Sequence, residues 1–220
     1  MPGTLYIVST PIGNLEDITF RAVETLKNAD LIAAEDTRHT KILLDRYGIK
    51  TPTTSYFEYN RVRKTDYLLK LIGEGKSVAL VTDAGTPGIS DPGYTIIRAC
   101  VEKNIPVVPV PGPSALLAAL SASGKPADTF TFVGFLSNKS ARRRNELKRL
   151  HGEGRTVVLY ESPHRIIKFL EDLLEVYSDT DIVLAREVTK KFEELRREKP
   201  SELIEHFKKT PPRGEFTIIV

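Results

Sequence analysis

Short apolar runs rich in valine and isoleucine alternate with amphipathic segments along the chain, and this alternation limits the possible folds more than any other feature. The runs Leu5–Ser9, Leu31–Ala34 and Val78–Val81 have the length and character of buried strands. Apolar residues at helical spacing follow the first run, between Ile18 and Leu26, and Asp17 is the predicted N-cap of that helix. Strands that alternate with helices predict an α/β protein.

Three prolines within five residues, Pro109, Pro111 and Pro113, interrupt this pattern near the middle of the chain. Proline fixes its own backbone and donates no hydrogen bond, so the segment can form neither helix nor inner strand. We therefore expect a domain boundary here, with an N-terminal α/β domain over residues 1–111 and a C-terminal α/β domain over residues 112–220. Each of these domains would have about a hundred residues, which is an ordinary domain size.

Composition excludes several classes of protein. Of 220 residues, 40% are hydrophobic and 28% charged, which argues against disorder. No apolar run approaches the roughly 20 residues of a membrane span, and Met1–Thr10 lacks a signal-peptide pattern, so we expect a cytoplasmic protein with no membrane partner. The single cysteine, Cys100, excludes an internal disulfide and a multi-thiolate site, and the four histidines lack metal-site spacing.

Three segments that follow predicted strands are built from glycine, proline and small polar residues: 9–14, 82–93 and 111–115. Ligands of open parallel sheets bind beyond the carboxyl ends of the strands. Glycine permits close backbone approach, and we expect a ligand held mainly by main-chain groups, such as a nucleoside. Any one segment could instead be an ordinary turn. None has the Rossmann or P-loop pattern, and Ser162-Pro163-His164 is no nucleophile elbow.

The formal net charge of +3 is too small to identify a nucleic-acid-binding protein by itself. The segment Lys139–Arg149, however, holds six basic residues and one acidic residue, Glu146. It is either a solvated helix face or a contact for an RNA backbone. Similarly, Tyr56, Phe57 and Tyr59 either pack within the protein or stack on an extruded base.

Motifs spread in order over nearly the whole chain are similar to those of the ribosomal RNA small subunit methyltransferase I family. They are Tyr6–Thr19, Ala34–Arg38, Asp83–Pro87, Pro111–Ala115, Tyr160–Arg165, Ala185–Lys190 and Gly214-Glu215. In two places the chain departs from the wider superfamily. Thr10–Gly13 stands where relatives often carry several glycines, and Gly85-Thr86-Pro87 stands where many have Gly-Asp-Pro.

The resemblance implies a two-domain tetrapyrrole methylase-like fold with a cofactor cleft between the domains, and S-adenosyl-L-methionine as the cofactor. It implies methyl transfer to the ribose 2′-hydroxyl of a cytidine in 16S rRNA, the partner being that RNA within the small ribosomal subunit. It also implies a homodimer. No metal is needed, because the sulfonium is already activated and positioning can supply about 7–11 kcal/mol of the acceleration.

Site residues are expected on both halves of the chain. For the cofactor they are Pro11, Gly13, Asp83, Ala84, Gly85, Thr86, Ile89, Ser114, Ala115 and Tyr160. For RNA they are Arg38, Arg142, Arg143, Arg144, His164, Arg165 and Arg186. The hydroxyl needs a general base, for which the candidates are Glu35, Asp36, Glu161, His164 and Glu187. We expect Asp36 or Glu161 to take part.

Two other functions remain open from the sequence. A methyltransferase of the same fold could act on a small molecule such as a corrin precursor, but such an enzyme needs no basic segment. A non-catalytic RNA-binding assembly factor would need the basic segment but not the three glycine- and proline-rich loops.

Overall fold

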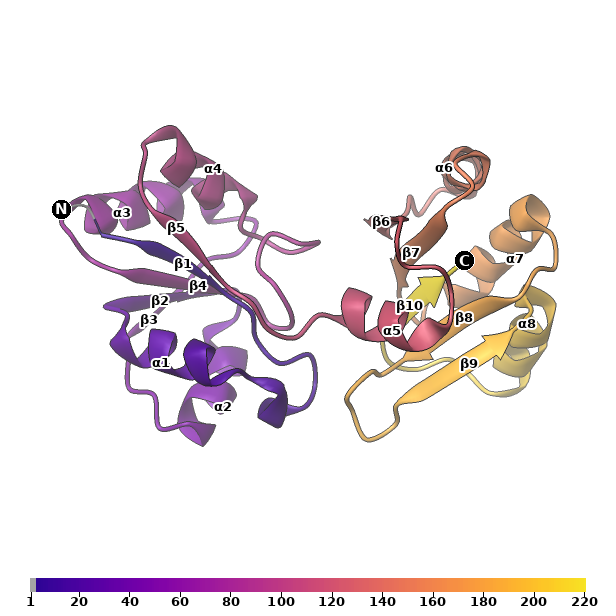
Figure 1. The fold of residues 1–220 in the computed structure, drawn as a ribbon, viewed down its shortest axis with the longest axis horizontal. Coiled ribbons are helices and arrows are strands. Elements are labelled where there is room, and N and C mark those ends of the chain that lie inside the picture. Colours follow the sequence, from indigo (N-terminus) through magenta and orange to yellow (C-terminus); the bar gives the residue numbers. More distant parts are fainter. Residues whose placement is uncertain (1–2) are drawn as a thin grey trace. The chain divides into compact units, whose positions relative to one another are not determined.

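The computed structural model describes residues 3–220, which form two compact units, one ending at Ser114 and the other spanning Ala115–Val220. Each unit contains one five-stranded sheet with helices packed against it, so the chain is an α/β protein (Figure 1). The expected boundary between residues 111 and 112 lies in the same proline-rich segment as the division between the units, and we keep it as a proposed domain boundary.

The first unit is a parallel sheet with the strand order β3-β2-β4-β1-β5. Its strands are β1 (Leu5–Val8), β2 (Leu31–Ala34), β3 (Thr53–Ser55), β4 (Val78–Val81) and β5 (Val107–Val110). Its helices are η1 (Leu15–Asp17), α1 (Phe20–Asn28), α2 (Thr37–Arg46), α3 (Arg61–Gly73) and α4 (Tyr94–Glu102). Because all strands are parallel, their carboxyl ends meet at one edge of the sheet.

Helices cover both faces of this sheet (Figure 1). On one face, Leu26 of α1 and Leu43 of α2 pack in one apolar cluster. On the other face, Leu68 of α3 and Ile96 of α4 pack in a second cluster. A parallel sheet buried on both faces needs continuous apolar strands, which explains the valine and isoleucine runs of the sequence.

The second unit has a mixed sheet with the order β6-β7-β10-β8-β9. Only β6 and β7 pair in parallel; β10 pairs antiparallel with β7 and β8, and β8 with β9. The strands are β6 (Phe130–Phe135), β7 (Thr156–Glu161), β8 (Ile182–Arg186), β9 (Glu194–Glu198) and β10 (Phe216–Ile219). The helices are α5 (Ala115–Ser123), α6 (Ser140–Gly152), α7 (Ile166–Tyr177) and α8 (Pro200–Lys209).

The first helix begins later than its sequence predicts. Thr19, not Asp17, is the N-cap of α1, and its Oγ1 accepts a hydrogen bond of 3.1 Å from the N–H of Ala22. Asp17 ends the short helix η1, and Ile18 after it is extended, so the chain turns once before α1 starts. Among residues 3–220, no helix is both long and apolar enough to cross a bilayer.

Candidate functional site

Hydrogen bonds join the loops that follow β1 and β4. The N–H of Thr10 donates to the carbonyl oxygen of Gly85 (2.9 Å), and the N–H of Gly85 donates to that of Thr10 (3.0 Å). The hydroxyl of Thr10 donates to the carbonyl oxygen of Thr82 (2.9 Å), and the hydroxyls of Ser9 and Thr86 share a hydrogen bond of 2.8 Å. The two loops therefore form one connected surface at the carboxyl edge of the first sheet.

The loop after β5 packs against the same surface. The N–H of Ser9 donates to the carbonyl oxygen of Val110 (3.2 Å). A Cβ atom on Gly112 would lie 3.0 Å from the Cβ of Ser9, so glycine allows this close approach. At Gly85 the reason for glycine is different, because its φ of +88° is one that other residues rarely adopt. We call these three segments the joined loops: 9–14, 82–93 and 111–115.

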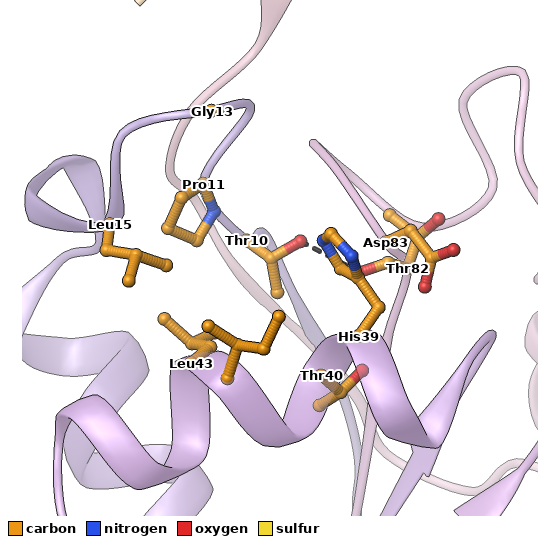
Figure 2. Close-up of a pocket in the computed structure, with 10 residues that line it drawn as sticks. Thr10, Pro11, Gly13, Leu15, His39, Thr40, Leu43, Thr82 and Asp83 are labelled. Carbon is orange, nitrogen blue, oxygen red and sulfur yellow. Dashed lines mark hydrogen bonds between the residues drawn. The ribbon is translucent and has the colours of Figure 1, made fainter. Parts of the chain in front are cut away.

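A pocket of about 280 Å³ opens beside the joined loops, between the end of β1, the end of β4 and helix α2. Figure 2 shows its lining: Thr10, Pro11, Gly13, Leu15, His39, Thr40, Ile42, Leu43, Thr82 and Asp83. The pocket follows from the position of α2, which starts directly after β2 and so brings its first turns to the same sheet edge as the loops.

Three carboxylates lie at this edge. Glu35 accepts a hydrogen bond of 2.5 Å from the hydroxyl of Thr82 and one of 3.3 Å from the N–H of Asp83. Asp83 in turn accepts one of 3.1 Å from the N–H of Asp36. Burial raises the pKa of Asp83, and the negative charges of Glu35 and Asp36 raise it further. The hydrogen bond from the Asp36 N–H acts in the opposite direction and lowers it.

Asp36 is the N-cap of α2 and is tied to Arg38. Its Oδ1 accepts from the N–H (2.8 Å) and Nε (3.1 Å) of Arg38, and its Oδ2 accepts from Nη2 (2.7 Å). The Arg38 guanidinium holds the pKa of Asp36 well below its usual range, so Asp36 is ionised. The side chain of Arg38 is 90% exposed, which leaves it accessible to RNA. The expected roles of both residues stay predictions.

Glu161, the other expected catalytic carboxylate, has a different environment. Its side chain is fully buried, and burial raises its pKa. Its Oε1 accepts a hydrogen bond of 2.7 Å from the N–H of Ser162 and lies 3.1 Å from Nε of Arg165. Because a carboxylate without exposed surface does not touch a substrate hydroxyl, we no longer assign Glu161 as the base. Two further candidates for the base differ in accessibility. His164 is exposed, whereas the Glu187 carboxylate already accepts hydrogen bonds from Lys190 and from the N–H of Glu215.

The expected cofactor residues lie in both units. In the first unit, Pro11, Gly13 and Asp83 line the pocket, and Gly85 and Thr86 lie where the loops join. Ala84 and Ile89 are exposed in the loop after β4, and Ser114 ends the first unit. In the second unit, Ala115 begins α5, and the hydroxyl of Tyr160 accepts a hydrogen bond of 3.1 Å from the N–H of Leu116. Their roles in binding a cofactor stay predictions.

The structure corrects one expected RNA contact, Arg143. This side chain is only 3% exposed and forms a buried ion pair of 2.5 Å with Asp172, so it holds α6 against α7. Arg144 is partly exposed but also pairs with Asp172, whereas Arg142 is exposed. The sequence does not single out Lys168 of α7, which is exposed. Its carbonyl oxygen accepts a hydrogen bond from Arg143 (3.3 Å), which places its backbone next to α6.

The other expected nucleic-acid contacts also divide into residues that are engaged within the protein and residues that are exposed. Arg165 donates to the carbonyl oxygen of Leu136 (2.7 Å), and Arg186 lies 3.5 Å from Glu194, so both are engaged within the protein. Tyr56 does not stack on a base, since it is 1% exposed and shares a hydrogen bond with Thr65. Phe57 and Tyr59 are exposed.

Comparison with known proteins identifies the class. Residues 4–204 match the tetrapyrrole (corrin/porphyrin) methylases. The structure superimposes on a cobalt precorrin-4 methyltransferase with a TM-score of 0.75, at 19% identity, covering 98% of this chain and 93% of the other. It superimposes on a Thermus thermophilus uroporphyrin-III C-methyltransferase complexed with S-adenyl homocysteine with a TM-score of 0.66, at 19% identity, covering 99% and 97%. The chain therefore has the fold of these methylases.

A sequence relative narrows this class. The ribosomal RNA small subunit methyltransferase I of Thermotoga maritima is 50% identical over 218 residues, 99% of this chain and 98% of the relative. Within the tetrapyrrole methylases, the chain belongs to the ribosomal RNA small subunit methyltransferase I family.

Proposed function

We propose that this protein transfers the methyl group of S-adenosylmethionine to the ribose 2′-hydroxyl of a cytidine in 16S rRNA. The observation that carries the proposal is the union of the three joined loops into one peptide-lined surface, in a chain of this family. The name of the Thermotoga relative supports rRNA as the acceptor.

The residues present fit the methyl donor. Gly85, at φ +88°, is buried, and its N–H and carbonyl oxygen are both hydrogen-bonded to Thr10, so it shapes the loop surface from beneath. Gly13, Ala84 and Ile89 are exposed in the same loops. Peptide groups of the joined loops would hold the nucleoside part of the cofactor. When bound, S-adenosylmethionine supplies a methyl group on a sulfonium that already makes a good leaving group.

The chain's own residues position the acceptor. Asp36 is ionised and able to accept a hydrogen bond from the ribose hydroxyl, which orients the oxygen for attack. Glu35 and Thr82 fix the backbone that carries Asp83, so these groups hold their places before the RNA arrives. Precise placement of two bound reactants is an effect large enough to dominate such a transfer.

The RNA backbone would be held by exposed cations of the second unit. Lys139, Arg142 and Lys168 lie at the start of α6 and on α7, and all three are exposed. We call them the basic face. Phosphate contacts of this kind supply affinity without reading sequence.

Replacing the three residues of the basic face with alanine should weaken rRNA binding and flatten its salt dependence. If each contacts one phosphate of a single strand, the slope of log K against log salt falls by about 2 in magnitude. Filter binding at several salt concentrations measures the slope. A matched control removes the same charge elsewhere on the unit, at the exposed Lys208, Lys209 and Arg213. Equal slopes for the two variants would show that the basic face is merely solvated.

Two alternatives are distinguished by the substrate. Methylation of a corrin precursor is compatible with the fold, because the cobalt precorrin-4 methyltransferase has the same fold. Such an activity does not account for the basic face. A non-catalytic assembly factor does not account for the joined loops.

We further propose that the enzyme acts in the cytoplasm, as a homodimer, on RNA in the small ribosomal subunit. Transfer of labelled methyl from S-adenosylmethionine to that RNA tests the proposed function.

A further inference from the structure

The pocket beside the joined loops has the chemical character of a nucleobase site. Its walls are apolar, formed by Pro11, Leu15, Ile42 and Leu43. Polar groups gather elsewhere in the lining, among them Thr40 and Asp83 (Figure 2). A lining with apolar walls and a separate polar part suits a ligand with flat apolar faces and a polar edge. A nucleobase that has been taken out of its stack is such a ligand.

Thr40 supplies a buried hydroxyl that lacks a partner. Its residue is 3% exposed, and within residues 3–220 no group forms a hydrogen bond with its Oγ1. The other hydroxyls of the pocket are engaged, since Thr10 donates to the carbonyl of Thr82 and Thr82 donates to Glu35. A buried polar atom without a partner is costly in the free protein, so it indicates a ligand group that completes it.

Asp83 supplies an acceptor on the same pocket. Its Oδ1 accepts the N–H of Asp36, and in the described part of the chain its Oδ2 accepts no hydrogen bond. A carboxylate accepts hydrogen bonds from the exocyclic amino group of cytosine or adenine. Uracil has a carbonyl oxygen at the position of the cytosine amino group, and that oxygen would face the carboxylate unfavourably.

Resting on the proposed function, we propose that this pocket binds a nucleobase with an exocyclic amino group. Asp83 accepts from the amino group, Thr40 bonds the polar edge of the ring, and the apolar walls cover its faces. Two molecules of the reaction carry such a base: the acceptor cytidine, and the adenosine of the methyl donor. The pocket chemistry is the same for both, and the experiment separates them.

The test uses two near-isosteric variants, Thr40→Val and Asp83→Asn, with Thr25→Val as the matched control in α1. Each protein is titrated with S-adenosylhomocysteine in a calorimeter. Each is also assayed for kcat/KM on small-subunit rRNA transcripts with cytidine or uridine at the nucleotide that the wild type methylates. Because the Thr40 hydroxyl has no partner in the free protein, Thr40→Val should leave Tm unchanged, which separates a ligand role from a structural one.

If the base is the acceptor's, both variants lose about tenfold in kcat/KM on the cytidine transcript, and Asp83→Asn also loses its preference for cytidine over uridine. Their affinity for S-adenosylhomocysteine stays within twofold. If the base is the donor's adenine, the variants bind S-adenosylhomocysteine about tenfold more weakly and keep the preference. Both results support the proposal that the pocket binds a nucleobase.

Unchanged affinity and unchanged kcat/KM in both variants would overturn the nucleobase pocket, while activity of the wild type on rRNA would still uphold the proposed function. A wild type inactive on rRNA would refute the proposed function, and the calorimetric arm would then decide the pocket alone.

Discussion

Gly85→Val should weaken S-adenosylmethionine binding by about 100-fold or more, equivalent to roughly 3 kcal/mol. Valine at the φ of +88° found for Gly85 costs about 1–3 kcal/mol in backbone strain. Relieving that strain moves the peptide that exchanges two hydrogen bonds with Thr10, so the loops after β1 and β4 separate. Calorimetric titration of the variant with S-adenosylmethionine measures the effect.

Gly48→Val is the matched control. Gly48 has a φ of +63°, and a Cβ there would meet no atom within 4 Å, so the substitution brings backbone strain outside the joined loops. We expect it to lower stability but to leave the affinity unchanged. If Gly85→Val binds S-adenosylmethionine as tightly as Gly48→Val does, the joined loops do not hold the cofactor.

Asp172→Ala should cost about 3–5 kcal/mol of unfolding free energy, the largest stability effect that we expect. Asp172 accepts hydrogen bonds from Nε of Arg143 (2.7 Å), from Ser140 (2.7 Å) and from Arg144 (3.1 Å). Its loss leaves the buried guanidinium of Arg143 without its carboxylate between α6 and α7. Urea unfolding followed by circular dichroism measures the change.

Two comparisons separate the buried charge from a general effect of substitution. Replacing both partners, Arg143→Met with Asp172→Leu, should recover most of the loss, because no charge is then left buried. Asp45→Ala breaks an exposed ion pair with Lys41 and should cost less than about 1 kcal/mol. If Asp172→Ala is no more destabilising than Asp45→Ala, then the Arg143–Asp172 pair does not stabilise the unit.

The parallel sheet of the first unit was the part of the fold most open to prediction. Strands β1, β2 and β4 are buried on both faces, so their apolar runs stand out in the sequence. The edge strand β9 gives no such signal, because its sequence is mostly charged. Its Arg196 is paired with Glu194 and Glu198 along the strand, a pattern that carries no apolar alternation.

The site was predictable only where local sequence determines it. Glycine and proline mark the joined loops without any knowledge of the fold. The burial of Arg143 had a signal in its spacing, because Leu147 and Leu150 follow it at helical intervals and form the buried face of α6. The pocket had no such signal, since Thr40 meets Thr10 and Asp83 only when α2 and two strand ends are brought to one edge.

Mapping of the methylated nucleotide tests the account most directly. The protein is incubated with labelled S-adenosylmethionine and small-subunit rRNA, free and within subunits, and the labelled position is found by nuclease digestion and alkaline hydrolysis. We predict label in one cytidine whose 3′ linkage resists alkali, because a methylated 2′-hydroxyl cannot attack the adjoining phosphate. Label on a base, or no label in RNA while a corrin precursor accepts it, would contradict the account.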